Sequence, residues 1–140
     1  MRKSYDSPSI RVTYDPRKCI HAKRCVEGSP EVFRPGERPW IQPEKSDADA
    51  LAATIARCPT GSLRYERLGN PPGPAEPIPA EVTIALQKDG PVFVRGPVPV
   101  VDAAGNRWED AGHRYALCRC GGSANKPYCD NTHLTMGFEG

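Results

Sequence analysis

The six cysteines of this 140-residue chain fall into two tight groups, and this grouping limits how the chain can fold. The N-terminal stretch MRKSYDSPSIRV lacks the apolar segment of a secretory signal, so we expect a cytoplasmic protein with reduced thiols. In a reducing compartment, grouped cysteines bind metal more often than they form disulfides. The groups are Cys19, Cys25 and Cys58, then Cys118, Cys120 and Cys129.

A proline-rich stretch separates the two groups. Residues 69–80, GNPPGPAEPIPA, contain five prolines and two glycines, which exclude a helix or a central strand and predict an extended linker. We therefore expect a domain at 10–68, a linker at 69–79 and a second domain at 80–140. Domains of this size bury a small core, and a metal centre in each would stabilise them.

Short helices and strands are expected in both halves, which gives an α+β fold class. IRVTYD at 10–15 alternates apolar and polar residues like a strand, and SLRYE at 62–66 predicts a second strand. SDADALAATIARC at 46–58 predicts a helix with Ser46 as its N-cap. In the second half, β-prone runs are broken by turns at Asp89-Gly90 and at 104–106.

The second cysteine group has the spacing C-x-C-x8-C-x3-H and ends at His133. Three thiolates and one imidazole can enclose a soft or borderline metal centre. Cys129 and His133 are four residues apart and would share one face of a helix. We expect Asp130 to cap that helix, and the Gly121 and Gly122 N–H groups, with the Ser123 hydroxyl, to donate to sulfur.

The stretch CRCGGSANKPYCDNTH, residues 118–133, resembles the CDGSH iron–sulfur signature of mitoNEET-type proteins. The resemblance implies a 2Fe–2S cluster and extends back to a β-rich cap beginning near residue 80, through which these proteins form homodimers. Asn131 stands where the signature has Gly, and Thr132 stands where it has Ser. The ligands implied are Cys118, Cys120, Cys129 and His133.

Two other interpretations of this group stay open. A structural zinc site with three Cys and one His uses the same residue types, although its ligand pairs are more often two to four residues apart. Disulfides are the other alternative. A Rieske centre needs two histidines, and the nearby His113 falls outside the spacing.

The first cysteine group is a ferredoxin-like set with one cysteine missing. Cys19 and Cys25 match the outer members of C-x2-C-x2-C, while Ala22 occupies the middle position, and Cys58 is followed by proline as in bacterial ferredoxins. Three thiolates suit a 3Fe–4S cluster, or a 4Fe–4S cluster with His21 as the fourth ligand. Unrelated buried thiols or a zinc site would be the simpler alternatives.

The segment 10–68 thus resembles a divergent single-cluster ferredoxin domain, on the basis of C-x-H-x3-C, VEGSPEVF and CPTGSL. The implied cofactors are this 3Fe–4S or 4Fe–4S cluster and the 2Fe–2S cluster. They would be bound by Cys19, Cys25 and Cys58 in the first domain, and by Cys118, Cys120, Cys129 and His133 in the second.

The expected function is electron transfer or redox sensing, with redox or cluster-acceptor proteins as partners. The sequence shows no nucleophile–base pair, phosphate-binding loop or paired carboxylates, so we do not expect an enzyme. A net charge of +2 does not favour nucleic acid, and no apolar run is long enough to span a membrane. Cluster storage and transfer is the alternative function, and a zinc-stabilised interaction module is a further one.

Overall fold

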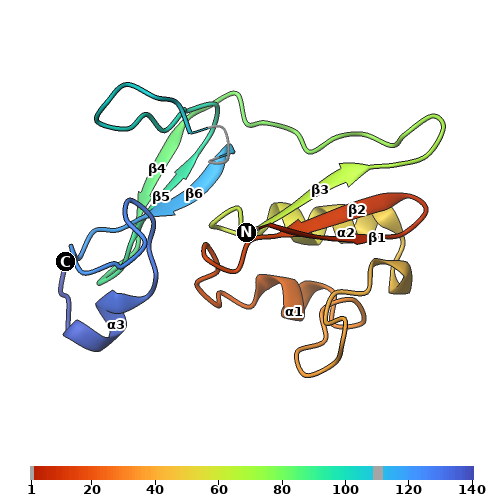
Figure 1. Cartoon of the computed structure of the whole chain (residues 1–140), viewed down its shortest axis with the longest axis horizontal. Helices are drawn as coiled ribbons and strands as arrows, with labels where there is room; N and C mark the ends of the chain where they lie inside the picture. The colour runs from red at the N-terminus through yellow and green to blue at the C-terminus, as the bar shows by residue number, and fades with distance from the viewer. Residues whose placement is uncertain (1, 109–111) are drawn as a thin grey trace. The chain divides into compact units, whose positions relative to one another are not determined.

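The computed structural model describes residues 2–108 and 112–140 and divides the chain into two compact units (Figure 1). Each unit is built on a three-stranded antiparallel sheet with few helices, which confirms the expected α+β class. Within the described ranges, none of the helices has the length and apolar character needed to cross a membrane.

The first unit has a sheet of order β1-β2-β3 with helix α2 packed against it (Figure 1). Ile10 and Val12 of the central strand are fully buried and meet Leu51 and Ile55 of α2 in one core. Alternating burial along β2 follows from the period of two in a strand. The bounds are β1 (Lys3–Asp6), β2 (Ile10–Tyr14), β3 (Leu63–Arg67) and α2 (Ala48–Ala56).

The strands expected at 10–15 and 62–66 and the helix expected at 46–58 are therefore present. The expected N-cap was wrong, because Asp47 rather than Ser46 caps α2: its carboxylate accepts a hydrogen bond from the Ala50 N–H at 2.9 Å. Three short elements were not anticipated, and none of them has a long apolar period. They are β1, helix α1 (Arg24–Gly28) and the 3-10 helix η1 (Pro43–Lys45).

The second unit has a sheet of order β4-β5-β6, followed by the short helix α3. Both expected turns are present: the Gly90 N–H donates to the Gln87 carbonyl at 3.0 Å, and the Gly105 N–H donates to the Asp102 carbonyl at 3.0 Å. A small core is formed by Val94 and Tyr115 of the sheet together with Tyr128. The bounds are β4 (Thr83–Leu86), β5 (Val92–Arg95), β6 (Arg114–Leu117) and α3 (Thr132–Met136).

Two short segments of the N-terminal half also pack in this second unit, at residues 17–20 and 59–61. At the second of them, Gly61 has a φ of 68° and lies directly against the backbone of Arg114 in β6. The domain boundaries expected at 10–68 and 80–140 stay a prediction, since packing does not define which stretches fold independently.

Replacing Gly61 with alanine should destabilise the protein. An added Cβ would lie 2.5 Å from the Arg114 carbonyl oxygen, and the left-handed backbone by itself costs an alanine about 1–2 kcal/mol. We expect the free energy of unfolding to fall by more than about 2 kcal/mol in urea denaturation followed by circular dichroism.

Gly105→Ala is the matched control, because Gly105 has a φ of 88° and nothing within 4 Å of an added Cβ. It should lose only the backbone contribution. Equal losses in the two variants would mean that the approach to Arg114 is not tight enough to matter.

Candidate metal centres

The loop between β6 and α3 is closed at its base by backbone hydrogen bonds. The Cys118 N–H donates to the Pro127 carbonyl at 2.8 Å, and the Cys129 N–H donates to the Ala116 carbonyl at 2.9 Å. Leu117 and Tyr128 form an antiparallel bridge between these bonds. The strand pairing of β6 thus continues into the loop and brings the cysteine-bearing ends of the loop together.

The four predicted ligands of this loop lie in two pairs. The Cys118 and Cys120 sulfurs are 3.8 Å apart, and the Cys129 sulfur is 3.6 Å from His133 Nδ1. Two thiolates on one tetrahedral ion are about 3.8 Å apart, and a thiolate and an imidazole nitrogen are about 3.6 Å apart. Each pair therefore has the spacing of two ligands on one ion.

The two pairs do not merge into one site for a single ion. Over residues 2–108 and 112–140, no group of three or more His, Cys, Asp or Glu side chains is placed to hold one metal ion. The pairs are nonetheless neighbours, because a Cβ added at Gly122 would lie 3.7 Å from the Cys120 sulfur and 2.9 Å from Thr132, the residue before His133. The donors present can therefore bind two adjacent ions with two protein ligands each.

The expectation that Cys129 and His133 share a helix face was wrong. Cys129 lies ahead of α3, which begins at Thr132, and Asn131 between them has a left-handed backbone with a φ of 72°. This turn, rather than helical spacing, directs the buried imidazole of His133 at the Cys129 sulfur. Asn tolerates the left-handed conformation, so the position keeps the turn without the Gly of the signature.

Backbone N–H groups point at the sulfurs, as expected for Gly121 and Gly122. Gly121 donates to the Cys118 sulfur at 3.3 Å and Gly122 donates to the Cys120 sulfur at 3.3 Å. The expectation for the Ser123 hydroxyl was wrong, because it donates to the Tyr128 carbonyl at 2.6 Å and so braces the loop. The N–H groups of Gly121 and Gly122 stabilise negative charge on the sulfurs to which they donate.

Asp130 ties the two sides of the loop together. Its carboxylate accepts hydrogen bonds from the Ala124 N–H at 2.9 Å and from the Thr132 N–H at 3.1 Å, as well as from the Thr132 hydroxyl. These bonds, that of the Thr132 hydroxyl foremost, lower the pKa of Asp130. Asn131 rather than Asp130 occupies the N-cap position of α3, but the Asp130 carboxylate does accept a free N–H of the first turn, as expected, and connects that turn to residue 124.

The pKa values of Cys118 and Cys129 are shifted in opposite directions. Burial acts to raise the pKa of Cys118, but N–H donors from Ser123 and Gly121, the neighbouring Cys120 and the charge of Lys126 outweigh it, so the pKa is lowered. Burial raises the pKa of Cys129. Metal binding needs the thiolate, so Cys118 is the better prepared ligand. Sequence reasoning missed Lys126, whose role depends on its place in space.

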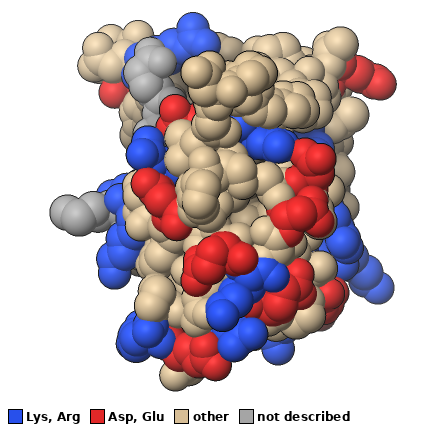
Figure 2. All heavy atoms as spheres, turned by 90° about the vertical axis from the view of Figure 1, so that its right-hand side faces the viewer, with Lys and Arg blue, Asp and Glu red and all other residues tan. Residues whose placement is uncertain are grey.

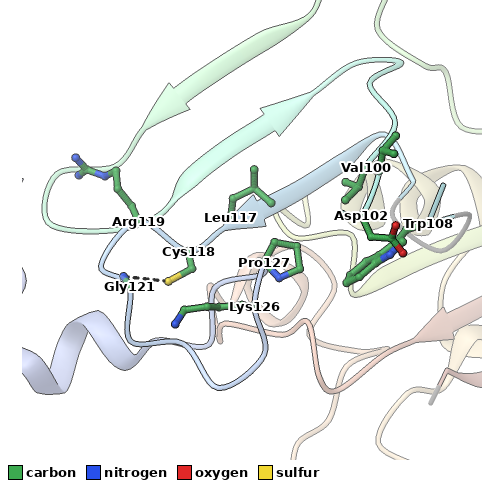
Figure 3. A pocket seen from close by; sticks show the side chains of 10 residues that line it. Val100, Asp102, Trp108, Leu117, Cys118, Arg119, Gly121, Lys126 and Pro127 are labelled. Atoms are coloured by element: carbon green, nitrogen blue, oxygen red, sulfur yellow. Dashed lines mark hydrogen bonds between the residues drawn. The ribbon is translucent and has the colours of Figure 1, made fainter. Parts of the chain in front are cut away.

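A cavity of about 580 Å³ opens beside Cys118 (Figure 3). Val100, Leu117 and Pro127 give it apolar walls, and Trp108 lies on the side away from the cysteine. The Arg119 guanidinium is directed away from it and donates to the Gln87 and Gly90 carbonyls. The cavity exposes one side of the loop to solvent.

The three cysteines of the first group lie on different local structures. Cys25 is in α1, and the hydroxyls of Ser29, at the end of α1, and Thr54, in α2, share a hydrogen bond of 2.8 Å that joins the two helices. Cys58 is buried just after α2, and its sulfur is 3.3 Å from the Ser62 hydroxyl. Cys19 is half-buried in the segment 17–20 of the second unit.

The histidines considered for these sites are placed differently from one another. His21 is exposed and has a φ of 57°, while His133 is buried. His113 lies ahead of β6, and its carbonyl accepts a hydrogen bond from the Gly96 N–H at 2.9 Å.

Comparison with known families covers both halves of the chain. Residues 5–68 match the family described as "Divergent 4Fe-4S mono-cluster", and residues 89–134 match the family described as "Iron-binding zinc finger CDGSH type". The uncharacterized protein YjdI of Escherichia coli (strain K12) is 32% identical over 63 residues, which cover 45% of this chain and 83% of YjdI. The same protein from Escherichia coli O157:H7 matches to the same extent.

The chain belongs to the YjdI family. It is an iron–sulfur protein in which a divergent 4Fe–4S mono-cluster domain precedes a CDGSH-type iron-binding domain. This confirms the domain order that the two family resemblances implied.

Proposed function

We propose that the protein is an electron carrier or redox sensor. The loop between β6 and α3, called the CDGSH-type loop from here on, would bind a 2Fe–2S cluster. The observation that supports this cluster is the arrangement of the four donors in two pairs, each with the spacing of two ligands on one ion. A 2Fe–2S cluster needs two protein ligands on each of two irons. Cys118 and Cys120 would hold one iron, and Cys129 with His133 the other, as in the mitoNEET-type proteins that the loop resembles.

The same arrangement disfavours the zinc alternative. A structural zinc ion needs all four ligands around one point. In the described part of the chain, no three such donors meet that condition. The N–H groups of Gly121, Gly122 and Asn131 donate to three sulfurs, which suits a cluster whose charge changes on reduction.

For the first domain we propose a 3Fe–4S or 4Fe–4S cluster on Cys19, Cys25 and Cys58. In such clusters each iron takes one thiolate, and the three cysteines supply three. The match to a divergent 4Fe–4S mono-cluster family supports the assignment. His21 remains the candidate for a fourth ligand because of its position in the motif.

Metal and sulfide analysis of protein purified without oxygen tests both clusters. We expect a brown protein with more than two irons per chain, with labile sulfide and without zinc, and its EPR spectrum distinguishes 3Fe–4S from 4Fe–4S. Two irons per chain would contradict the first cluster alone. A colourless protein with zinc would contradict the whole electron-transfer proposal.

Cluster storage and transfer is the second candidate function. The observation that favours it is the histidine ligand, because acid competes with iron for an imidazole nitrogen and free histidine titrates near pH ~6.5. The exposed Leu134 and Met136 lie beside His133 on α3, where an acceptor could dock.

Repeated reduction and reoxidation separates the two functions. For an electron carrier we expect the iron content to stay constant through these cycles, with no gain of iron by an added apo-ferredoxin. Transfer of iron and sulfide to the apo-ferredoxin would favour the storage function instead.

The variant His133→Cys should lose its visible absorbance much more slowly than the native protein at mildly acidic pH.

We also propose a homodimer formed through the β-rich cap. Strand β4 lies at the sheet edge, and Ile84 and Leu86 on one of its faces are 68% and 67% exposed. A strand edge with an apolar face is suited to pair with a second copy. Sedimentation equilibrium should give twice the chain mass for the native protein and the monomer mass for Leu86→Lys, whereas a monomeric native protein would contradict this.

The remaining proposals concern partners, catalysis and location. Basic and acidic side chains are interspersed on the face in Figure 2, which supports protein partners rather than nucleic acid. We propose that the protein is not itself an enzyme, and that its partners are redox or cluster-acceptor proteins. We propose a cytoplasmic location, where grouped cysteines stay reduced and can bind metal.

A further inference from the structure

The segment 17–20, which carries Cys19, is part of the second unit although it comes from the N-terminal half. It lies outside every helix and strand. Contacts with side chains of the CDGSH-type loop contribute to its position.

Two asparagine amides of the CDGSH-type loop bracket Cys19. Asn125 Nδ2 donates to the Arg17 carbonyl at 2.8 Å, and Asn131 Nδ2 donates to the Ile20 carbonyl at 2.9 Å. The two accepting carbonyls lie on either side of Cys19 in the chain. Together the amides hold the segment at two points.

A third contact comes from the residue directly before Cys19. Lys18 is only 4% exposed, and its ammonium lies 4.9 Å from the centre of the Tyr128 ring. A cation over an aromatic face is attracted to it, more strongly when it is removed from water. Three positions of the loop, at intervals of three residues, thus contact the segment.

The hydrogen bonds donated by the two asparagine side chains are not needed to form the loop itself. The left-handed turn at residue 131 suits Gly at least as well as Asn, so the amide of Asn131 is not required for the turn. The backbone of Asn125 is already held, because its N–H donates to the Ser123 hydroxyl at 3.0 Å. In both residues the amide is directed at the segment 17–20.

We propose that Asn125 and Asn131 are positioning residues that hold the Cys19-bearing segment on the CDGSH-type loop. This inference rests on the proposed role of Cys19 as a ligand of the first cluster. The loop that binds the second cluster then also places a ligand of the first. An intact loop is therefore needed for full retention of the first cluster.

Hydrogen–deuterium exchange of the purified protein tests the anchor directly. Each of Asn125→Ala and Asn131→Gly removes one amide, and the second keeps a residue that accepts the left-handed backbone. One hydrogen bond corresponds to about a fivefold change in local opening, so exchange at 17–20 should accelerate about fivefold in each variant. Exchange within α2 serves as the internal reference and should not change.

Asn106→Ala is the matched control, because Asn106 is an exposed asparagine in a separate turn of the same unit. It should leave exchange at 17–20 at the native rate. Native exchange at 17–20 in the double variant Asn125→Ala/Asn131→Gly would overturn the proposal.

Iron release to a chelator, followed in the same variants, tests the consequence for the cluster. The EPR signal of the first cluster should disappear faster than in the native protein, while the visible absorbance of the 2Fe–2S cluster persists. Faster exchange with unchanged release of the first cluster would overturn the positioning of Cys19 as a ligand. A protein without clusters would refute the proposed function, yet the exchange measurement would still decide whether the amides hold the segment.

Discussion

The second unit depends on the continuation of strand pairing beyond the end of β6. Hydrogen bonds from the N–H groups of Cys118 and Cys129 close the base of a loop that has little regular structure of its own. Backbone pairing is a strong local constraint because buried N–H and carbonyl groups must find partners. The two cysteines donate the closing bonds themselves, so fixing the backbone also fixes the origin of each thiol side chain.

The loop around those cysteines is organised to favour negative charge on sulfur. N–H groups point at three thiols, and Lys126 adds a positive charge near Cys118. Burial opposes this at Cys129, whose pKa is raised. Cys118 and Cys129 thus differ in how readily they ionise, and Cys118 is the better prepared of these two thiols to bind a metal.

Much of this could be predicted from the sequence, because short-range patterns determined it. The strands at 10–15 and 62–66 and the helix at 46–58 follow from local sequence patterns. The order of the two domains follows from the family resemblance of each cysteine group. The errors arose where a local rule had competitors. Asp47 competes with Ser46 for the helix cap, and a left-handed Asn131 interrupts the helix assumed between Cys129 and His133.

The placement of residues 17–20 and 59–61 could not be predicted from short-range sequence patterns. Nothing in the local sequence around Cys19 indicates that its neighbours accept hydrogen bonds from residues more than a hundred positions away. The same is true of Gly61, whose lack of a side chain lets it lie against Arg114. Contacts between distant segments depend on the final fold, and a single sequence carries no direct record of them.

The packing of residues 17–20 and 59–61 in the second unit limits where the chain can be divided. The proline-rich stretch is the boundary that the sequence suggests. A C-terminal fragment that begins there would lack two segments that pack in its own unit. Exchange of one half for a homologous half from another protein would need matching residues at 17–20 and 59–61, well outside the half being exchanged.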